Sequence, residues 1–172
     1  EQRKFLKEIH YRMNDKNYFG IGFKNDSGGY EIRNKYSKIC LGKKDVSMIK
    51  NGSENLKIFE GFFDFLSFKN IEKSLSDEKS DYIILNSVSM ISKIKSLLEN
   101  HKNIGLYFDN DEAGNRAVET LKKEFENVED DRILYKDFKD LNDWAMSSTK
   151  LEEKFGGSLV QKVPKVYNKR GR

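Results

Sequence analysis

Short apolar runs alternate with longer amphipathic stretches through the middle of this 172-residue chain, and this alternation limits the folds open to it. The apolar runs have the length of strands, and the longer stretches carry apolar residues at helical spacing. The strands are expected at 56–59, 82–85, 104–108 and 133–135, and the helices at 62–75, 88–98, 113–125 and 141–146. Such alternation predicts βαβ units, and therefore an α/β fold with an open, mostly parallel sheet flanked by helices.

The first part of the chain follows a different pattern. Two short runs, 18–23 and 30–32, flank the stretch Asn25-Asp26-Ser27-Gly28-Gly29. Two strand-length runs around such a glycine-containing turn are typical of a β-hairpin. We therefore expect a small β-rich subdomain before the α/β core.

Charge is strongly segregated, although the formal net charge is only +4. Residues 1–52 carry 12 Lys and Arg against 6 Asp and Glu, residues 53–160 carry 15 against 22, and residues 161–172 carry 5 against none. Basic ends around an acidic middle suit a protein that binds metal ions centrally and a polyanion around them, although solvated surface charge would give the same counts. The expected domains are a basic β-rich subdomain (1–52), an acidic α/β core (53–155) and a basic flexible tail (156–172).

The composition excludes several classes of protein. No apolar run approaches the roughly 20 residues that cross a bilayer, and no secretory leader is visible, so we expect a cytoplasmic protein without membrane contact. Cys40 is the only cysteine, and His10 and His101 are the only histidines. These numbers exclude a disulfide framework and a metal cage built mainly from Cys or His, so carboxylates must hold most of any bound metal.

Acidic residues follow three of the predicted strands. The strand ends of a parallel sheet meet at one edge, where ligands of open α/β sheets bind. We therefore expect the acids to gather there. They are Glu60 and Asp64 after the first strand, Asp109 and Asp111 after the third, and Asp140 and Asp143 after the fourth.

The Asp109-Asn110-Asp111 spacing has a physical consequence. In an extended segment residues i and i+2 point to the same side, so both carboxylates can face one cavity. Such crowding makes it costly to ionise both groups unless a divalent cation compensates, and oxygen ligands favour Mg²⁺ or Mn²⁺. The alternative for any one of these Asp residues is an ordinary helix N-cap, and for Glu60 an ordinary surface position. Asn86 and Ser87, after the second strand, are expected to cap a helix.

Several segments resemble motifs of one family. Glu60-Gly61-Phe62-Phe63-Asp64 resembles the E-G-x-x-D motif of Toprim domains, and residues 108–114 resemble the F-D-x-D-x-A-G motif of DnaG-type bacterial primases. Residues 139–143 resemble the later K-D-x-N/D-D/E segment of these primases, and 85–89 lie where they have a small-residue loop. Ile21-Gly22-Phe23 and Asn34-Lys35-Tyr36 resemble the G-F and K-Y segments of their basic subdomain. The resemblance covers roughly 18–146 and extends to the variety carried by mobile elements.

This resemblance implies a Toprim fold that binds divalent metal and acts on nucleic-acid phosphodiesters. Carried over by position, Glu60 would be the catalytic acid/base or metal-organising residue, and Asp109 and Asp111 the catalytic metal ligands. Asp64 and Asp143 would lie at the edge of the metal cluster. Arg33 and Lys35 would contact nucleic acid or nucleotide. The implied partners are single-stranded DNA and nucleotides, with a helicase or another replication protein in addition.

The implied reaction is metal-dependent nucleotidyl transfer on a single-stranded DNA template. The matched stretch contains neither the Cys/His zinc-binding domain nor the helical subdomain of these primases, so we expect the catalytic core of a longer or reduced primase-like protein. Two other functions stay open. One is a Toprim-type metal-dependent nuclease, and the other is a non-catalytic nucleic-acid-binding module of a replication or mobilisation complex. A receiver-type phosphoacceptor fold also gathers acids at strand ends, but no clear K-P motif follows a late strand.

Overall fold

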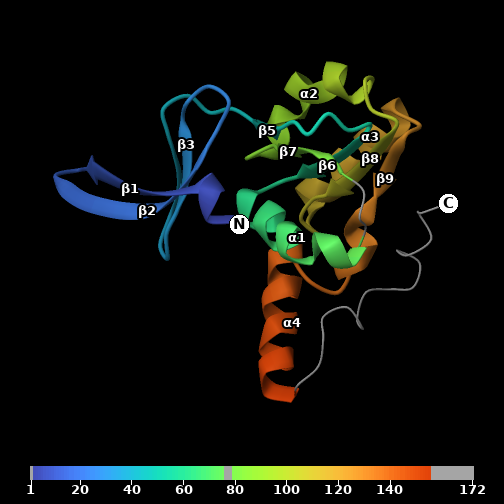
Figure 1. Ribbon diagram of the computed structural model, residues 1–172. Coiled ribbons are helices and arrows are strands. Elements are labelled where there is room, and N and C mark those ends of the chain that lie inside the picture. Colours follow the sequence, from blue (N-terminus) through green and yellow to red (C-terminus); the bar gives the residue numbers. More distant parts are fainter. Residues whose placement is uncertain (1, 76–78, 156–172) are drawn as a thin grey trace.

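The computed structural model describes residues 2–75 and 79–155 (Figure 1). After a short 3-10 helix, η1 (Gln2–Phe5), four strands form an antiparallel sheet in the order β1-β2-β3-β4. The predicted hairpin is confirmed, since β2 and β3 pair around the expected turn. The sequence did not predict the two outer strands. The four strands are β1 (Leu6–Met13), β2 (Lys16–Lys24), β3 (Tyr30–Arg33) and β4 (Lys38–Leu41).

Two turns show why these residues form hairpins. Asn14 and Asp15 join β1 to β2, and both have positive φ angles, of 50° and 59°. A two-residue loop with positive φ at both positions matches the twist of the flanking strands, and Asn and Asp tolerate this conformation better than most residues. In the β2–β3 turn Gly28 has a φ of 83°. Both turns are therefore specified locally.

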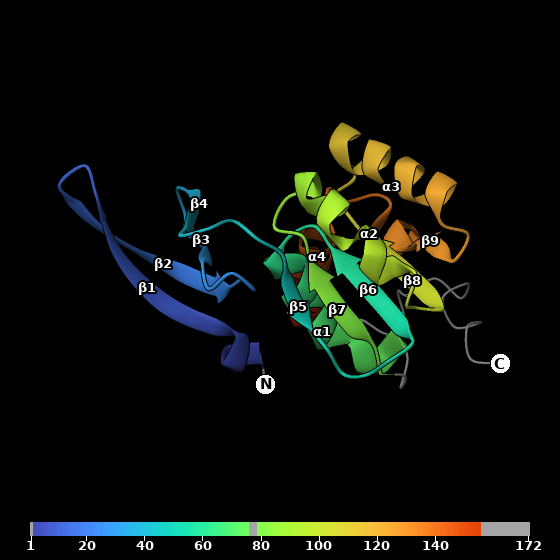
Figure 2. The ribbon, with the colours of Figure 1, turned by 90° about the horizontal axis from the view of Figure 1, so that it is seen from above.

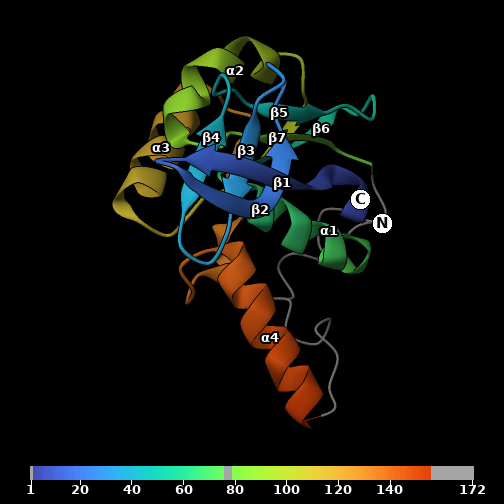
Figure 3. The same cartoon turned by 90° about the vertical axis from the view of Figure 1, so that its left-hand side faces the viewer.

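The second sheet has five strands in the order β5-β7-β6-β8-β9, all parallel except β5. Helices cover both of its faces, with α2 and α3 on one and α1 and α4 on the other (Figures 1 and 3). The predicted open, mostly parallel α/β sheet with a β-rich N-terminal part is confirmed. Its strands are β5 (Ser47–Ile49), β6 (Asn55–Phe59), β7 (Asp81–Ile84), β8 (Asn103–Tyr107) and β9 (Val128–Asp130). The helices are α1 (Phe62–Leu75), η2 (Val88–Met90), α2 (Ile91–Leu98), α3 (Glu112–Glu124), η3 (Asp131–Tyr135) and α4 (Leu141–Phe155).

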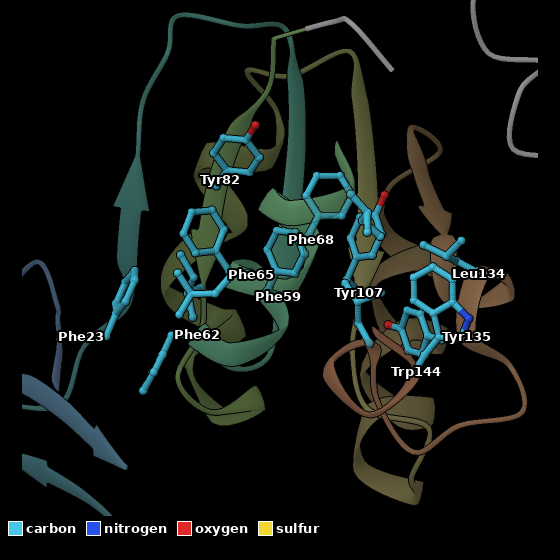
Figure 4. Close-up of a cluster of buried hydrophobic side chains, with 14 residues drawn as sticks. Phe23, Phe59, Phe62, Phe65, Phe68, Tyr82, Tyr107, Leu134, Tyr135 and Trp144 are labelled. Carbon is cyan, nitrogen blue, oxygen red and sulfur yellow. The ribbon is translucent and has the colours of Figure 1, made fainter. Parts of the chain in front are cut away.

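Each face of this sheet has its own apolar core. Alternate residues of a strand point to opposite faces, so in β6 Ile58 faces α2 and α3 while Phe59 faces α1 and α4. The core on the α1 and α4 side is rich in aromatic rings (Figure 4). Phe59 stacks on Tyr107 with ring centroids 4.9 Å apart, and Phe23 of β2 stacks on Phe62 of α1 at 5.3 Å. This core therefore continues from the second sheet into the first.

Hydrogen bonds also join the two sheets. Asp26, in the β2–β3 turn, donates its N–H to the Val46 carbonyl and accepts from the Met48 N–H with its side chain. Asn86, expected to cap a helix, is instead fully buried, and its Nδ2 donates to the Asp45 carbonyl at 2.8 Å. That expectation was wrong because Asn86, with a φ of 61°, turns its side chain toward the segment before β5. Ser87 occupies the N-cap of η2 without a side-chain bond.

The predicted fourth strand at 133–135 was wrong. These residues belong to the 3-10 helix η3, which Asp130 caps by accepting the N–H of Arg132. The fourth parallel strand is β9, immediately before it, which forms one edge of the sheet. The apolar run marks burial rather than strand, since Leu134 and Tyr135 enter the core while Ile133 is exposed.

The predicted domain boundaries remain predictions. The first sheet ends at Leu41, and β5 lies within the predicted N-terminal segment although it pairs with β7 of the second sheet. The predicted basic tail, 156–172, lies outside the described residues. Within the described ranges, no helix combines the length and apolarity needed to cross a membrane.

Candidate metal and phosphate site

A cleft of about 200 Å³ opens where the carboxyl ends of β6 and β8 meet the first sheet. We call it the acidic cleft. Acidic side chains lie beside basic ones along its walls, and Phe62 and Phe63 complete the lining. Its other lining residues are Arg33, Lys38, Glu60, Gly61, Asp64, Asp109, Lys139, Asp140 and Asn142.

Glu60 lies between β6 and α1, as the sequence predicted. Its Oε2 accepts the backbone N–H of Asp109 at 3.4 Å, which links the ends of two neighbouring strands. Burial raises the pKa of Glu60, and the nearby charge of Asp111 adds to the rise. The φ of Gly61 is not positive, so the backbone conformation does not by itself require glycine here. A Cβ on Gly61 would lie 3.2 Å from Oδ2 of Asp64, so glycine here leaves room for that carboxylate.

Asp64 and Asp109, two further acids expected at this edge of the sheet, also line the cleft. Burial raises the pKa of Asp64 to about 8, and the charges of Asp140 and Asp109 contribute to this rise. The pKa of Asp109 is raised to about 6, first by burial and then by Glu60 and Asp140. Asp64 also accepts the backbone N–H of Asn142 at 3.1 Å, which ties α1 to the start of α4. The cleft thus gathers carboxylates that repel one another in a partly dry environment.

Asp111 lies beside the cleft rather than in its lining. It is the N-cap of α3, and its Oδ1 accepts the N–H of Gly114 at 2.8 Å. The helix approaches so closely that a Cβ on Gly114 would lie 2.1 Å from the Asp109 carbonyl oxygen. The electrostatic effect of Asp111 on Glu60 shows that it still contributes to the field of the cleft.

At the start of α4 the cleft is lined by Asp140, whereas the predicted Asp143 is exposed. Asp140 caps the helix by accepting the N–H of Asp143 at 2.7 Å. The K-D-x-N-D segment pointed to this place, but it did not tell which of its two aspartates faces the cleft. The position of the first helical residue, Leu141, decides this.

Hydrogen bonds from Asn110 and Arg132 hold the loop of the D-x-D motif in place. Asn110 donates its side-chain amide to the carbonyls of Tyr135 and Phe138 and its backbone N–H to Lys139. Arg132 donates to the Asp109 carbonyl at 3.4 Å and to Asn115 at 2.7 Å. The sequence analysis singled out neither role. Together these bonds fix the backbone that carries Asp109.

The basic wall of the cleft comes from the first sheet and from the loop before α4. Arg33 and Lys38 are directly paired across β3 and β4, and Lys139 faces them from the core domain. The predicted Lys35 is exposed and lies 5.6 Å from the ring centre of Tyr36, outside the lining. Sequence reasoning missed Lys38 because only the β3–β4 register brings it to the cleft.

Arg33 is held between two partners. Its guanidinium lies 5.4 Å from the ring centre of Phe62 and 3.8 Å from Oε2 of Glu31. Burial lowers the pKa of Arg33, while the charge of Glu31 opposes this shift. Glu31 is itself only 1% exposed, and its Oε1 has no hydrogen-bond partner. A buried carboxylate therefore lies behind the arginine that reaches the cleft.

The donor chemistry of the cleft suits a hard divalent cation. Its anionic groups are all oxygen donors, and their mutual repulsion would be relieved by such an ion. Among residues 2–75 and 79–155, no three acidic, His or Cys side chains form a ready-made metal cage. Mg²⁺ does not require one, because it commonly binds one or two carboxylates and completes its shell with water and substrate phosphates.

The sequence model of the Toprim-like family matches residues 57–145, which confirms the predicted resemblance for more than half of the chain. A model described as a domain of unknown function (DUF8464) matches residues 1–42. No curated protein sequence matched the chain.

Two solved structures from bacteriophage T7 have a similar fold. The first is the primase fragment of the primase-helicase protein, with 19% sequence identity and a TM-score of 0.58 over 86% of this chain and 64% of that one. The second shows lagging-strand DNA polymerase interacting with primase domains of two gp4 subunits bound to an RNA/DNA hybrid and dTTP. Its match has 16% identity and a TM-score of 0.60 over 94% of this chain and 84% of that one. At these identities the similarity concerns the fold.

Proposed function

This chain belongs to the Toprim-like family, and on that premise we propose that it is the catalytic core of a primase-like nucleotidyltransferase. It would join nucleotides on a single-stranded DNA template with Mg²⁺ or Mn²⁺, in the cytoplasm. The observation that carries the proposal is the pairing of two opposite walls in one cleft. Carboxylates suited to a metal ion lie beside cations suited to phosphate oxygens.

Each wall has a defined task in this proposal. A 3′-hydroxyl attacks the α-phosphorus of a nucleoside triphosphate, a new P–O bond forms, and pyrophosphate leaves. Arg33, Lys38 and Lys139 bind phosphate oxygens of the incoming nucleotide. A divalent cation held by Asp109 and Asp111 would offset the charge that grows on the transferring phosphoryl group.

The remaining acids act around this centre. Glu60 accepts the proton of the attacking hydroxyl or organises a second ion, and its raised pKa moves it toward the range in which a general base works well. Asp64 and Asp140 lie at the edge of the cluster. A bound cation would favour the charged form of Asp64, whose pKa burial raises to about 8. Asp143 has a smaller role than the motif implied, since it lies outside the cleft lining. Lys35 would contact the template from its exposed loop.

The similar T7 structures suggest which molecules to test as partners. One is the primase fragment of a primase-helicase protein, and the other shows primase domains that interact with a DNA polymerase and are bound to an RNA/DNA hybrid and dTTP. We propose that this chain likewise works beside a helicase or another replication protein, and that it binds single-stranded DNA and nucleotides. The basic N-terminal subdomain is the part we expect to hold the template.

The decisive experiment is a primer-synthesis assay with labelled nucleotides, single-stranded DNA and Mg²⁺ or Mn²⁺. Labelled products that lengthen with time, and that disappear in Asp109→Asn but persist in the exposed control Asp15→Asn, would support nucleotidyl transfer. Shortening of the template with the same metal requirement would establish nuclease chemistry instead. DNA binding that survives EDTA, with no change in the length of any strand, would identify a binding module.

A further inference from the structure

Large apolar side chains are exposed on one face of the first sheet. On β2, Phe19 is 64% exposed and Ile21 is 43% exposed, and Tyr36, in the β3–β4 turn, is 88% exposed. Single exposed apolar residues are ordinary, but a contiguous group indicates an interaction surface. Phe23 lies two residues further along β2 on the same face and is only 3% exposed, because it packs on Phe62. One face of β2 is therefore buried at Phe23 and exposed at Ile21 and Phe19.

The strand register connects this exposed face with the acidic cleft. Ile21 pairs directly with Arg33, and Arg33 pairs with Lys38 on the next strand. Directly paired residues of an antiparallel sheet point to the same face. Since Arg33 and Lys38 line the cleft, the face that bears Phe19 and Ile21 continues outward from the phosphate-binding wall.

The loop that carries the exposed Tyr36 is tied to β2 and so lies beside this face. The side-chain nitrogen of Asn34 donates to the Phe19 carbonyl at 3.2 Å, and its oxygen accepts the N–H of Tyr36 at 2.9 Å. Across β1, the ring of His10 stacks on Phe19 with centroids 6.0 Å apart. We call these four residues, His10, Phe19, Ile21 and Tyr36, the stacking face.

The surroundings of the stacking face are basic. Lys35 lies beside the ring of Tyr36, and Arg12 and Lys16 lie near the tip of the β1–β2 hairpin. The one acid directly paired with the face, Glu8 opposite Ile21, lies within hydrogen-bond distance of Nε2 of His10, at 2.6 Å. At the hairpin tip Arg12 forms an ion pair with Asp15 at 3.1 Å. Figures 1 and 2 both show this hairpin reaching away from the five-stranded sheet, so it can contact a ligand that extends beyond the cleft.

We propose that the stacking face binds the unpaired bases of a single-stranded nucleic acid just outside the acidic cleft. This inference rests on the proposed function and adds the surface and the mode of recognition. Exposed rings beside cations are the combination that binds single strands, because every base has a π-face and every nucleotide a phosphate. The bases of a duplex are already stacked and cannot use this surface. The face therefore selects single strands without reading their sequence.

The test is a titration of the full chain with a labelled single-stranded oligonucleotide, followed by fluorescence anisotropy in the presence of EDTA. The double variant Phe19→Ala/Tyr36→Ala should bind about five- to a hundredfold more weakly, which is the range for loss of base stacking. The slope of affinity against salt concentration should not change, because no phosphate contact is lost. Phe19→Trp should retain the affinity of the wild type.

A matched control is Ile133→Ala, which removes an apolar side chain that is 49% exposed on the core domain and should not affect binding. Wild-type affinity in the double variant, or equal losses for single strands and duplexes, would overturn the proposal. So would a wild-type dimer that Phe19→Asp dissociates without weakening nucleic-acid binding, since the face would then cover a second copy of this chain. Because binding is measured without metal or turnover, loss of primer synthesis in Asp109→Asn does not alter its outcome.

Discussion

The five-stranded sheet is covered by helices on both faces, whereas, among the described residues, the first sheet has no helix along most of its strands and leaves Phe19 and Ile21 exposed. Burying a charged group is costly, and the acids of the cleft follow the strands of the covered sheet instead of lying within them. The first sheet can carry Arg33 and Lys38 within its strands. The acidic cleft forms where the end of one sheet meets the face of the other. The carboxylates of the cleft therefore come from the covered sheet, and Arg33 and Lys38 come from the more exposed one.

The contact between the two sheets, where Phe23 packs on Phe62, determines whether the acidic and basic walls of the cleft face each other. We call this contact the joint. Phe23 and Phe62 stack with an interplanar angle of 11°, and Arg33 lies over the same Phe62 ring. Phe62 therefore contacts both the buried ring of Phe23 and the guanidinium of Arg33. Variants that affect only one wall, or only the joint, separate their contributions.

The largest effect is expected from Glu60→Gln, which removes the charge from the acidic wall and keeps the shape of the side chain. Activity should fall by about 10²- to 10⁴-fold, the usual contribution of general acid–base catalysis. Folding should hardly change, and without metal the melting temperature should rise because carboxylate repulsion is relieved. Initial rates of primer synthesis, together with thermal melts, measure both.

Glu54→Gln is the matched control, since Glu54 precedes β6 at the end opposite Glu60 and is exposed. Near wild-type activity in Glu60→Gln would exclude a catalytic role for Glu60. If that variant failed to fold, Glu60 would instead be a structural partner of the Asp109 N–H.

The joint is tested by a pair of substitutions on one strand face. Phe23→Ala should lower the free energy of unfolding by about 3–5 kcal/mol, because it removes a buried ring from the aromatic core. Phe19→Ala, four residues away on the same strand face and exposed, should change the free energy by less than about 0.5 kcal/mol. Urea denaturation of both variants checks this. Similar losses for the two would show that the outer part of the sheet is packed in solution.

The sequence predicted the elements whose signal is local. The helix α1 was predicted with its observed bounds, because Phe62, Phe65 and Phe68 recur at helical spacing and enter one core. Strand β9 was missed, since only Val128 of its three residues is apolar and its pairing with β8 is a long-range contact. The apolar stretch after it was misread because periodicity cannot distinguish a short buried strand from a 3-10 turn.

In the cleft, too, residues marked by a local sequence signal were predicted, and residues placed by long-range contacts were not. Glu60, Asp64 and Asp109 were predicted from strand ends and motifs, and the structure brings them together, while their chemical roles remain predictions. Lys38 could not be chosen from the sequence, and Asp140 could not be preferred to Asp143. The first depends on strand register, and the second depends on where a helix begins.

A divalent cation should stabilise the protein by binding to the acidic wall of the cleft. At a metal concentration about 100-fold above Kd, Mn²⁺ should add about 2.7 kcal/mol to the stability of the wild type. The gain should vanish in Asp109→Asn/Asp111→Asn, whose Asp111→Asn change keeps an N-cap residue. Because the pKa of Asp109 is raised to about 6, protons compete with the metal, and the gain should shrink as pH falls through that range. Thermal melts at pH 5 and 8 measure this. An equal gain in the double variant would place the metal elsewhere.

The smallest effect concerns Glu31, which lies behind Arg33 in the basic wall. Without Glu31, the cation would be drawn toward Asp64, whose charge also acts on it, and away from the nucleotide phosphates. Glu31→Gln should therefore weaken nucleoside triphosphate binding by about fivefold, corresponding to roughly 1 kcal/mol of coupling. The substitution keeps the volume of the buried side chain.

A double-mutant cycle with Arg33→Gln distinguishes positioning from general support of the fold. If Glu31 acts through Arg33, Glu31→Gln should have no further effect on nucleotide affinity in the Arg33→Gln background. Equal losses in both backgrounds would mean that Glu31 supports the sheet alone. Isothermal titration calorimetry gives the four affinities, and melting temperatures show whether each variant is folded. The cycle thus tests whether buried Glu31 positions Arg33 in the first sheet. In the covered sheet, by contrast, the strand ends themselves position the acids.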